Sequence, residues 1–293
     1  MRKYLDPAVL AQLQGLELKA KLVVEGNLSG MHKSPFKGFS VEFAEHKSYF
    51  PGDDIRYIDW KLYGKSEKFF IKQYEEDTNL KSYLLLDTSK SMGFPEKSQT
   101  KLEYSIFLTV AMSYLMLSQR DSVGLLTFND SICDYIPPRN EMSHLHYIVD
   151  ILEKIKPANK TSISHSLKYL ASKIKRRGLI ILISDLVDDQ ENVLKHLAYL
   201  RKMKHEIIVF HIMHPDEVNI PYHGTVKFKN MENHGEITAI PDRIRNNYSK
   251  NLQNFINTYQ QNCWQEKIDY HRIITSVPVE KAILNYIAGR KKV

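Results

Sequence analysis

From about residue 79 onward, the chain alternates between short apolar runs and longer segments with apolar residues at helical spacing. The clearest strand-like runs are "LKSYLLLDTS" (80–89), "SVGLLTF" (122–128), "LIILISDL" (179–186) and "EIIVFHIM" (206–213). Strands separated by helices need crossover connections, which place neighbouring strands parallel in one sheet. The pattern therefore predicts an α/β fold with a doubly wound, mainly parallel sheet.

The spacing of apolar residues also predicts where the other elements lie. Helices are expected at 101–119, 141–155, 162–174, 191–204, 241–264 and 279–290. The run 131–138 ends in two prolines, which suit an edge strand because proline donates no hydrogen bond to a neighbour. Short β-like pieces are expected within 221–240, and a last strand at 267–276.

Residues 1–78 differ in character from the rest of the chain. They carry strand-like segments at 16–26 and 68–76, with a loop-rich stretch between them. We therefore expect an N-terminal β-rich appendage at 1–78. The main domain is expected at 79–293, where it continues into a C-terminal strand and helix.

Cysteine content and charge narrow the class of protein. Two cysteines, far apart in sequence, give no disulfide framework and fit a reducing cytoplasm. The longest apolar stretch, 105–117, is too short to span a bilayer, although peripheral attachment to a membrane stays open. The net charge is +7, but the basic runs at 173–177 and 289–293 lack the interleaved aromatic residues that stack on bases. The sequence therefore predicts a cytoplasmic protein and argues against nucleic-acid binding.

Polar side chains gather where three segments are expected to reach the same edge of the sheet. Asp87, Ser89 and Ser91 follow the first main-domain strand, Thr161 leads into a helix, and Asp185 ends the strongest strand. Ligands of doubly wound sheets bind at this edge, where the strand order reverses. Two carboxylates and three hydroxyls suit a hard cation such as Mg²⁺. Neutral hydroxyls leave most of the ion's charge in place, so that a further carboxylate can bind.

These motifs together resemble the metal-ion-dependent adhesion site of von Willebrand factor A domains. The resemblance covers roughly residues 80 to 215, and it consists of D-x-S-x-S after a strand, a threonine before a helix and an aspartate after a later strand. It implies that the five residues hold Mg²⁺ or Mn²⁺ and that an Asp or Glu of a partner completes the coordination. Many such domains carry an acid after the threonine, whereas this chain has Ser162, which predicts weaker metal binding or changed surroundings of the ligands.

The N-terminal run "PGDDIRYIDW" (51–60) resembles the hallmark of the prokaryotic family called domain of unknown function 58. The matching residues are Gly52, Asp53, Asp54, Arg56, Ile58, Asp59 and Trp60. The C-terminal segment 267–290 is also similar to the end of that family, so the resemblance covers nearly the whole chain. It implies association with a MoxR-type AAA+ ATPase. We therefore expect an adaptor for client proteins. ATP hydrolysis is not expected in this chain, because it has no G-x-x-x-x-G-K-[ST] loop of its own to bind ATP phosphates.

The carboxylates of the 51–60 run admit more than one interpretation. We favour a Pro-Gly turn with Asp–Arg pairing to Arg56 and with Trp60 as a packing anchor, or contact with a partner. Catalysis is the competing interpretation: a Mg²⁺-dependent hydrolase would use Asp185, or the pair Asp53 and Asp54.

The D-x-S-x-S run also has a purely structural interpretation. Serine and aspartate commonly cap helices and form turns, so the run from Asp87 to Ser91 alone fits an ordinary helix start. The coincidence with Thr161 and Asp185 favours metal binding.

Overall fold

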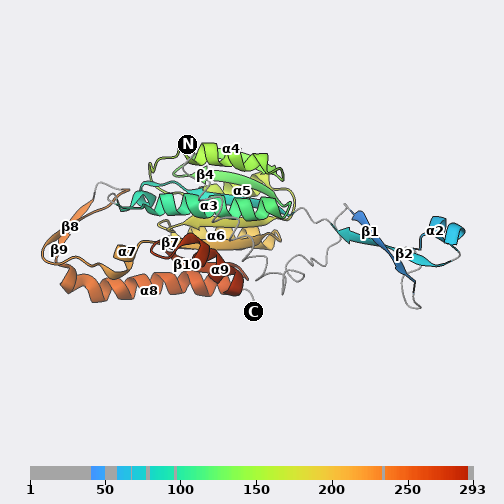
Figure 1. Cartoon of the computed structure of the whole chain (residues 1–293). Coiled ribbons are helices and arrows are strands. Elements are labelled where there is room, and N and C mark those ends of the chain that lie inside the picture. Colours follow the sequence, from blue (N-terminus) through green and yellow to red (C-terminus); the bar gives the residue numbers. More distant parts are fainter. Residues whose placement is uncertain are drawn as a thin grey trace. The chain divides into compact units, whose positions relative to one another are not determined.

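The computed structural model describes residues 41–49, 58–66, 68–76, 80–95, 98–232 and 235–289 (Figure 1). The chain divides into two compact units, one with the described residues from Leu80 onward and one within Glu25–Asn79. The expected strand at 16–26 lies outside the described residues, as do Asp53, Asp54 and Arg56.

The unit within Glu25–Asn79 contains a two-stranded antiparallel sheet and one helix. Strand β1 (Val41–Ser48) pairs with β2 (Phe70–Glu76), and helix α2 (Trp60–Ser66) lies between them in sequence. Strand β2 confirms the strand expected at 68–76. The expectation of a loop-rich stretch before it is wrong, because β1 and α2 fall there. Charged residues interrupt the apolar pattern of 41–48 and hide the strand.

Asp59 and Trp60 are the two residues of the family hallmark whose side chains the structure places at the start of α2. The Asp59 carboxylate accepts a hydrogen bond from the Leu62 backbone N–H at 3.1 Å, which caps the helix. The Trp60 side chain is 63% exposed and meets the Tyr63 ring edge to face. Trp60 is therefore not buried within this unit, and its role as a packing anchor or in contact with a partner stays a prediction.

The unit from Leu80 onward is built on a six-stranded sheet in the order β10-β7-β6-β3-β4-β5. The strands are β3 (Lys81–Asp87), β4 (Ser122–Phe128), β5 (Ile132–Arg139), β6 (Leu179–Ser184), β7 (Glu206–Met213) and β10 (Asp269–Ile274). Only β5 of these runs antiparallel to its neighbour, and it lies at the edge, as its prolines predicted. The predicted α/β fold with a doubly wound, mainly parallel sheet is confirmed.

Helices cover both faces of this sheet. Helices α3 (Lys101–Ser118), α4 (Ser143–Leu152) and α9 (Val279–Gly289) contribute to the core on one face, and α5 (Ile163–Lys173), α6 (Gln190–Lys202) and α8 (Pro241–Gln265) to the core on the other. Strand β3 shows why both cores form: Leu84 and Leu86 point to the first, and Tyr83 and Leu85 to the second. None of the helices that the structure describes is both long and apolar enough to cross a membrane.

The strand order reverses at β3, which positions the site. The chain passes from β3 to β4 and β5 on one side, and then returns to place β6 on the other side. The loops that follow β3 and β6 therefore diverge at the carboxyl edge of the sheet, where doubly wound folds bind ligands.

Three short elements were not expected in this form. A 3-10 turn (Lys90–Gly93) follows β3, helix α7 (Pro215–Asn219) follows β7, and the β-like pieces at 221–240 form a hairpin of β8 (Val226–Lys229) and β9 (Glu236–Ala239). All three lie in the segments that follow β3 and β7.

Candidate functional site

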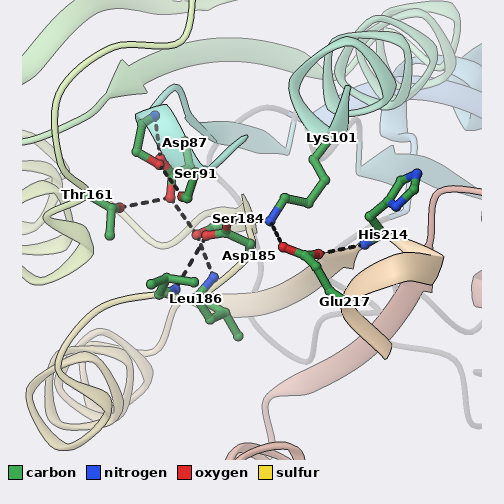
Figure 2. A network of polar contacts seen from close by, with 11 residues as sticks. Asp87, Ser91, Lys101, Thr161, Ser184, Asp185, Leu186, His214 and Glu217 are labelled. Carbon is green, nitrogen blue, oxygen red and sulfur yellow. Dashed lines mark hydrogen bonds and ion pairs between the residues drawn. The ribbon is translucent and has the colours of Figure 1, made fainter. Parts of the chain in front are cut away.

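The polar side chains predicted from sequence converge beyond β3 and β6. Figure 2 shows Asp87, Ser91, Thr161 and Asp185 directed toward one another from three different loops. Ser89 lies within the same turn as Ser91, and the two hydroxyl oxygens are 3.0 Å apart. The structure thus brings together all five residues that the sequence singled out as metal ligands.

Asp87 is the buried centre of the cluster, with 0% of its surface exposed. Its Oδ2 accepts hydrogen bonds from the Thr161 hydroxyl at 2.8 Å and the Ser184 hydroxyl at 2.7 Å. Its Oδ1 accepts from the Ser89 backbone N–H at 2.9 Å. Because these hydroxyls give their protons to Asp87, the lone pairs of the Thr161 oxygen stay available to another partner.

Backbone hydrogen bonds hold the Thr161 loop against the turn after β3. The Lys90 N–H donates to the Asn159 carbonyl at 2.9 Å, and the Ala158 N–H donates to the Thr88 carbonyl at 3.0 Å. These bonds join loops that are about seventy residues apart in sequence and fix Thr161 beside Asp87.

A carboxylate is present at the start of α5 even though Ser162 stands where an acid was expected. Asp188, in the loop after β6, accepts hydrogen bonds from the backbone N–H groups of Ile163 at 2.9 Å and Ser164 at 3.3 Å. It satisfies two amide groups that a helix start otherwise leaves without partners. The helix that Thr161 precedes is therefore anchored to the loop that carries Asp185.

Asp185 is engaged by a buried lysine that the sequence did not suggest. The Lys101 ammonium group lies 2.8 Å from Asp185 Oδ2 and 2.5 Å from Glu217 Oε1, and only 1% of the Lys101 side chain is exposed. Glu217 Oε2 accepts a further hydrogen bond from the His214 backbone N–H at 2.8 Å (Figure 2). The network links the start of α3 through the site to α7.

The two buried aspartates have opposite electrostatic environments. Burial raises the pKa of Asp87 to about 7, and the negative charge of Asp185 adds to the rise, while hydrogen bonds from Ser184 and Ser89 oppose it. Burial alone would also raise the pKa of Asp185, but the Lys101 ammonium group outweighs it and holds that pKa below its ordinary value. Asp185 is thus charge-compensated within the protein, whereas Asp87 is stabilised by hydrogen bonds alone.

A cleft of about 890 Å³ adjoins the cluster. Ser91 and Val187 line it beside the site, Glu217 and Glu232 contribute carboxylates, and residues of the β8–β9 hairpin line its other side. Its aromatic lining residues are Phe94, Tyr222, Phe228 and Tyr248. The cluster therefore opens toward a partly apolar surface that a protein segment could contact.

Sequence reasoning placed Ser184 beside Asp185 at the end of the strongest strand but gave it no role in the site, and it missed Lys101, Glu217 and Glu232. Ser184 precedes Asp185 and ends β6 with its side chain toward Asp87, so its position at the strand end was the available signal. Lys101 had a weaker signal, because a cation in the first turn of a helix opposes the helix dipole and calls for a local acidic partner. The two glutamates lie in short elements without apolar periodicity.

The strand order and the polar loops at the carboxyl edge of the sheet define a doubly wound α/β protein, with an N-terminal unit of its own. Residues 45–255 match the model of the family described as "Protein of unknown function DUF58", and the chain belongs to this family.

The relatives and solved structures that resemble this chain are distant. An uncharacterized protein of Mycobacterium tuberculosis (strain H37Rv) is 26% identical over 230 residues, which cover 78% of this chain and 72% of the relative. The conserved hypothetical protein BatB from Bacteroides thetaiotaomicron is 19% identical and matches 73% of this chain and 100% of its own, with a TM-score of 0.49. The SpRpn10 VWA domain is 14% identical and matches 71% of this chain and 95% of its own, with a TM-score of 0.41. Family membership rests on the family match.

Proposed function

We propose that this protein is a metal-dependent protein-binding module. In this proposal Mg²⁺ or Mn²⁺ is held by the side chains that converge beyond β3 and β6, and a partner protein supplies an acidic side chain to the ion. The metal ligands are Asp87, Ser89, Ser91, Thr161 and Asp185, directly or through water. The observation that carries the proposal is that the side chains of Asp87, Ser91, Thr161 and Asp185 converge from three loops (Figure 2), with the Thr161 hydroxyl on the buried Asp87 carboxylate and the Ser89 hydroxyl beside that of Ser91.

The spacing of the serine hydroxyls supports a cation of this kind. Adjacent corners of an octahedron with metal–oxygen distances of about 2.1 Å lie about 3.0 Å apart. The Ser89 and Ser91 oxygens are hydrogen-bonded at 3.0 Å, a separation that two neighbouring ligands of one ion would also have. Among the described residues, no group of three or more His, Cys, Asp or Glu side chains is arranged to hold a metal ion, so the site depends on its hydroxyls.

The charges around the site support the expectation that an anion binds there. Mg²⁺ or Mn²⁺ would supply a positive charge that attracts a carboxylate of a partner. Lys101 already compensates Asp185, so Asp87 is the carboxylate left to offset an added divalent charge. Ser89 and Ser91 contribute no charge, and the partly apolar cleft beside them suits a partner acid flanked by apolar residues.

The Mg²⁺-dependent hydrolase stays a less well supported alternative. A general base needs a carboxylate free to accept a proton from a water molecule. Asp185 is buried against Lys101 and has a lowered pKa, which makes it a poor base. Asp53 and Asp54 lie outside the described residues.

The wider role that we propose is that of an adaptor in the cytoplasm. The resemblance of the 51–60 run and of the family as a whole supports a MoxR-type AAA+ ATPase as partner, with a client protein as the other. In this scheme the acidic residue that binds the ion belongs to the ATPase or to the client, and the ATPase does the mechanical work.

A binding assay with a MoxR-type ATPase from the same organism tests this function. The immobilised wild-type protein should retain the ATPase in excess Mg²⁺ and release it in excess EDTA. An Asp87→Asn variant should fail to retain it in either condition, and a Glu191→Gln variant, which changes an exposed carboxylate on α6, should behave as wild type. Equal retention of the ATPase with Mg²⁺ and with EDTA would contradict a metal-dependent contact.

A further inference from the structure

The β8–β9 hairpin brings a glutamate to the mouth of the candidate site. Glu232 lies just after β8, and it lines the same cleft as Ser91. We propose that Glu232 is an internal acidic ligand of this site, which completes the coordination of the bound cation from within the chain until a partner's carboxylate displaces it. The inference rests on the proposed function, since it names what occupies the same site before a partner binds.

The first argument is a buried carboxylate oxygen. Among the described residues, Glu232 Oε1 has no hydrogen-bond partner although it is shielded from solvent. An acceptor in that state loses its hydration without compensation, which costs free energy. A cation held by the neighbouring Ser91 would supply the missing interaction.

The second argument is that Glu232 interacts with residues of the site itself. Glu232 lines the same cleft as Ser91, and its carboxylate lies within interaction range of the Ser91 hydroxyl, the Thr161 backbone and the Asp185 carboxylate. Two of the proposed ligand residues therefore face this carboxylate, and a third repels it. A partner's acidic side chain would need the same position relative to Ser91.

The third argument is the balance of charge. Asp87, Asp185, Glu217 and Glu232 lie in one network of interactions, and Lys101 is the cation that contacts two of them. Like-charged groups that are partly shielded from water repel one another strongly. A divalent cation held beside Ser91 would reduce the repulsion between Glu232 and Asp185.

The hairpin also contains a glutamate that serves as a matched control. Glu236, on β9, forms an ion pair with Lys227 across the hairpin, and its side chain is 40% exposed. Its substitution removes the same charge from the same hairpin as that of Glu232, but Glu236 is paired with Lys227 and is not among the residues that line the cleft. A Glu236→Gln variant therefore shows how much the loss of one negative charge from the hairpin changes the affinity for Mn²⁺ when Glu232 is kept.

Calorimetric titration of Mn²⁺ into the full chain tests the inference. Wild type and Glu236→Gln should bind Mn²⁺ with similar affinity, whereas Glu232→Gln should bind about tenfold more weakly, because one charged ligand is lost. Equal affinity of Glu232→Gln and wild type would overturn the inference while leaving the proposed function intact. Equal affinity of Asp87→Asn and wild type would instead show that the proposed function is wrong, and the inference with it.

Hydrogen exchange of the wild-type protein and of Glu232→Gln provides a second measurement. Mg²⁺ should slow the exchange of the backbone amides in 226–232 of the wild-type protein, because the ion ties the hairpin to the site. The effect should disappear in Glu232→Gln. If Mg²⁺ binds the wild type and the exchange of this segment does not change, Glu232 is not a ligand.

Discussion

Replacing Lys101 with methionine removes the ammonium group that joins α3 to Asp185 and Glu217. Methionine matches the length of the lysine stem, so the change acts mainly on charge. It leaves Asp185 buried, with 4% of its side chain exposed, beside the carboxylate of Asp87 and without its compensating cation. The Lys101→Met variant should therefore be much less stable than the wild type.

The size of the effect follows from the burial of the pair. Removing one partner of a buried ion pair costs about 3–5 kcal/mol. The Glu217 side chain is 29% exposed, so water screens its charge once the Lys101 ammonium group is removed. The uncompensated charge of the buried Asp185 therefore accounts for most of the lost free energy of unfolding. For a unit of this size the loss corresponds to a fall in melting temperature of about 10 °C.

Urea unfolding followed by circular dichroism measures this difference in the free energy of unfolding. Lys168→Met, which removes an exposed lysine on α5, is the control and should stay close to the wild type. Adding Asp185→Asn to Lys101→Met should recover much of the loss, because the uncompensated buried charge is then removed. A Lys101→Met variant within about 1 kcal/mol of the wild type would refute the view that this ion pair holds the site together.

Two further predictions concern residues around the site. Burial lowers the pKa of His211 to about 4 in the folded protein, whereas the ordinary pKa of a histidine is about 6.5. Between these two pH values the unfolded state binds a proton at His211 and the folded state does not. Stability should therefore be lost between about pH 6.5 and pH 4, by up to about 3 kcal/mol, and urea unfolding of His211→Gln should lack that slope. Asp188→Ala removes the acceptor for two amide groups of α5 and should cost about 1 kcal/mol in the same assay; an unchanged unfolding midpoint would contradict this role.

The sheet and its carboxyl edge could be predicted because their signals are local. Runs such as 179–183 are apolar at every position, as expected for strands buried on both faces, and they end at the polar residues of the site. A strand order that reverses at β3 then brings Asp87, Thr161 and Asp185 together, although Thr161 and Asp185 lie 74 residues or more from Asp87 in sequence. The candidate ligands were therefore accessible from sequence.

Residues that complete the site from a distance could not be predicted in this way. Lys101 pairs with Asp185 over 84 residues and with Glu217 over 116 residues, and a lysine at the start of a helix ordinarily faces solvent. Glu232 lies beyond a strand of four residues, too short to show a periodic pattern. In the N-terminal unit, charged residues interrupt the apolar pattern of 41–48 and concealed β1, which is recognised by its pairing with β2.

The central claim is that the side chains around Asp87 hold a divalent cation, and a titration of Mn²⁺ followed by calorimetry tests it most directly. The wild-type protein should bind one Mn²⁺ ion, and Asp87→Asn should lose that binding. Glu191→Gln, with an exposed carboxylate removed from α6, should retain it. Equal affinity of the wild type and Asp87→Asn for Mn²⁺ would contradict the claim.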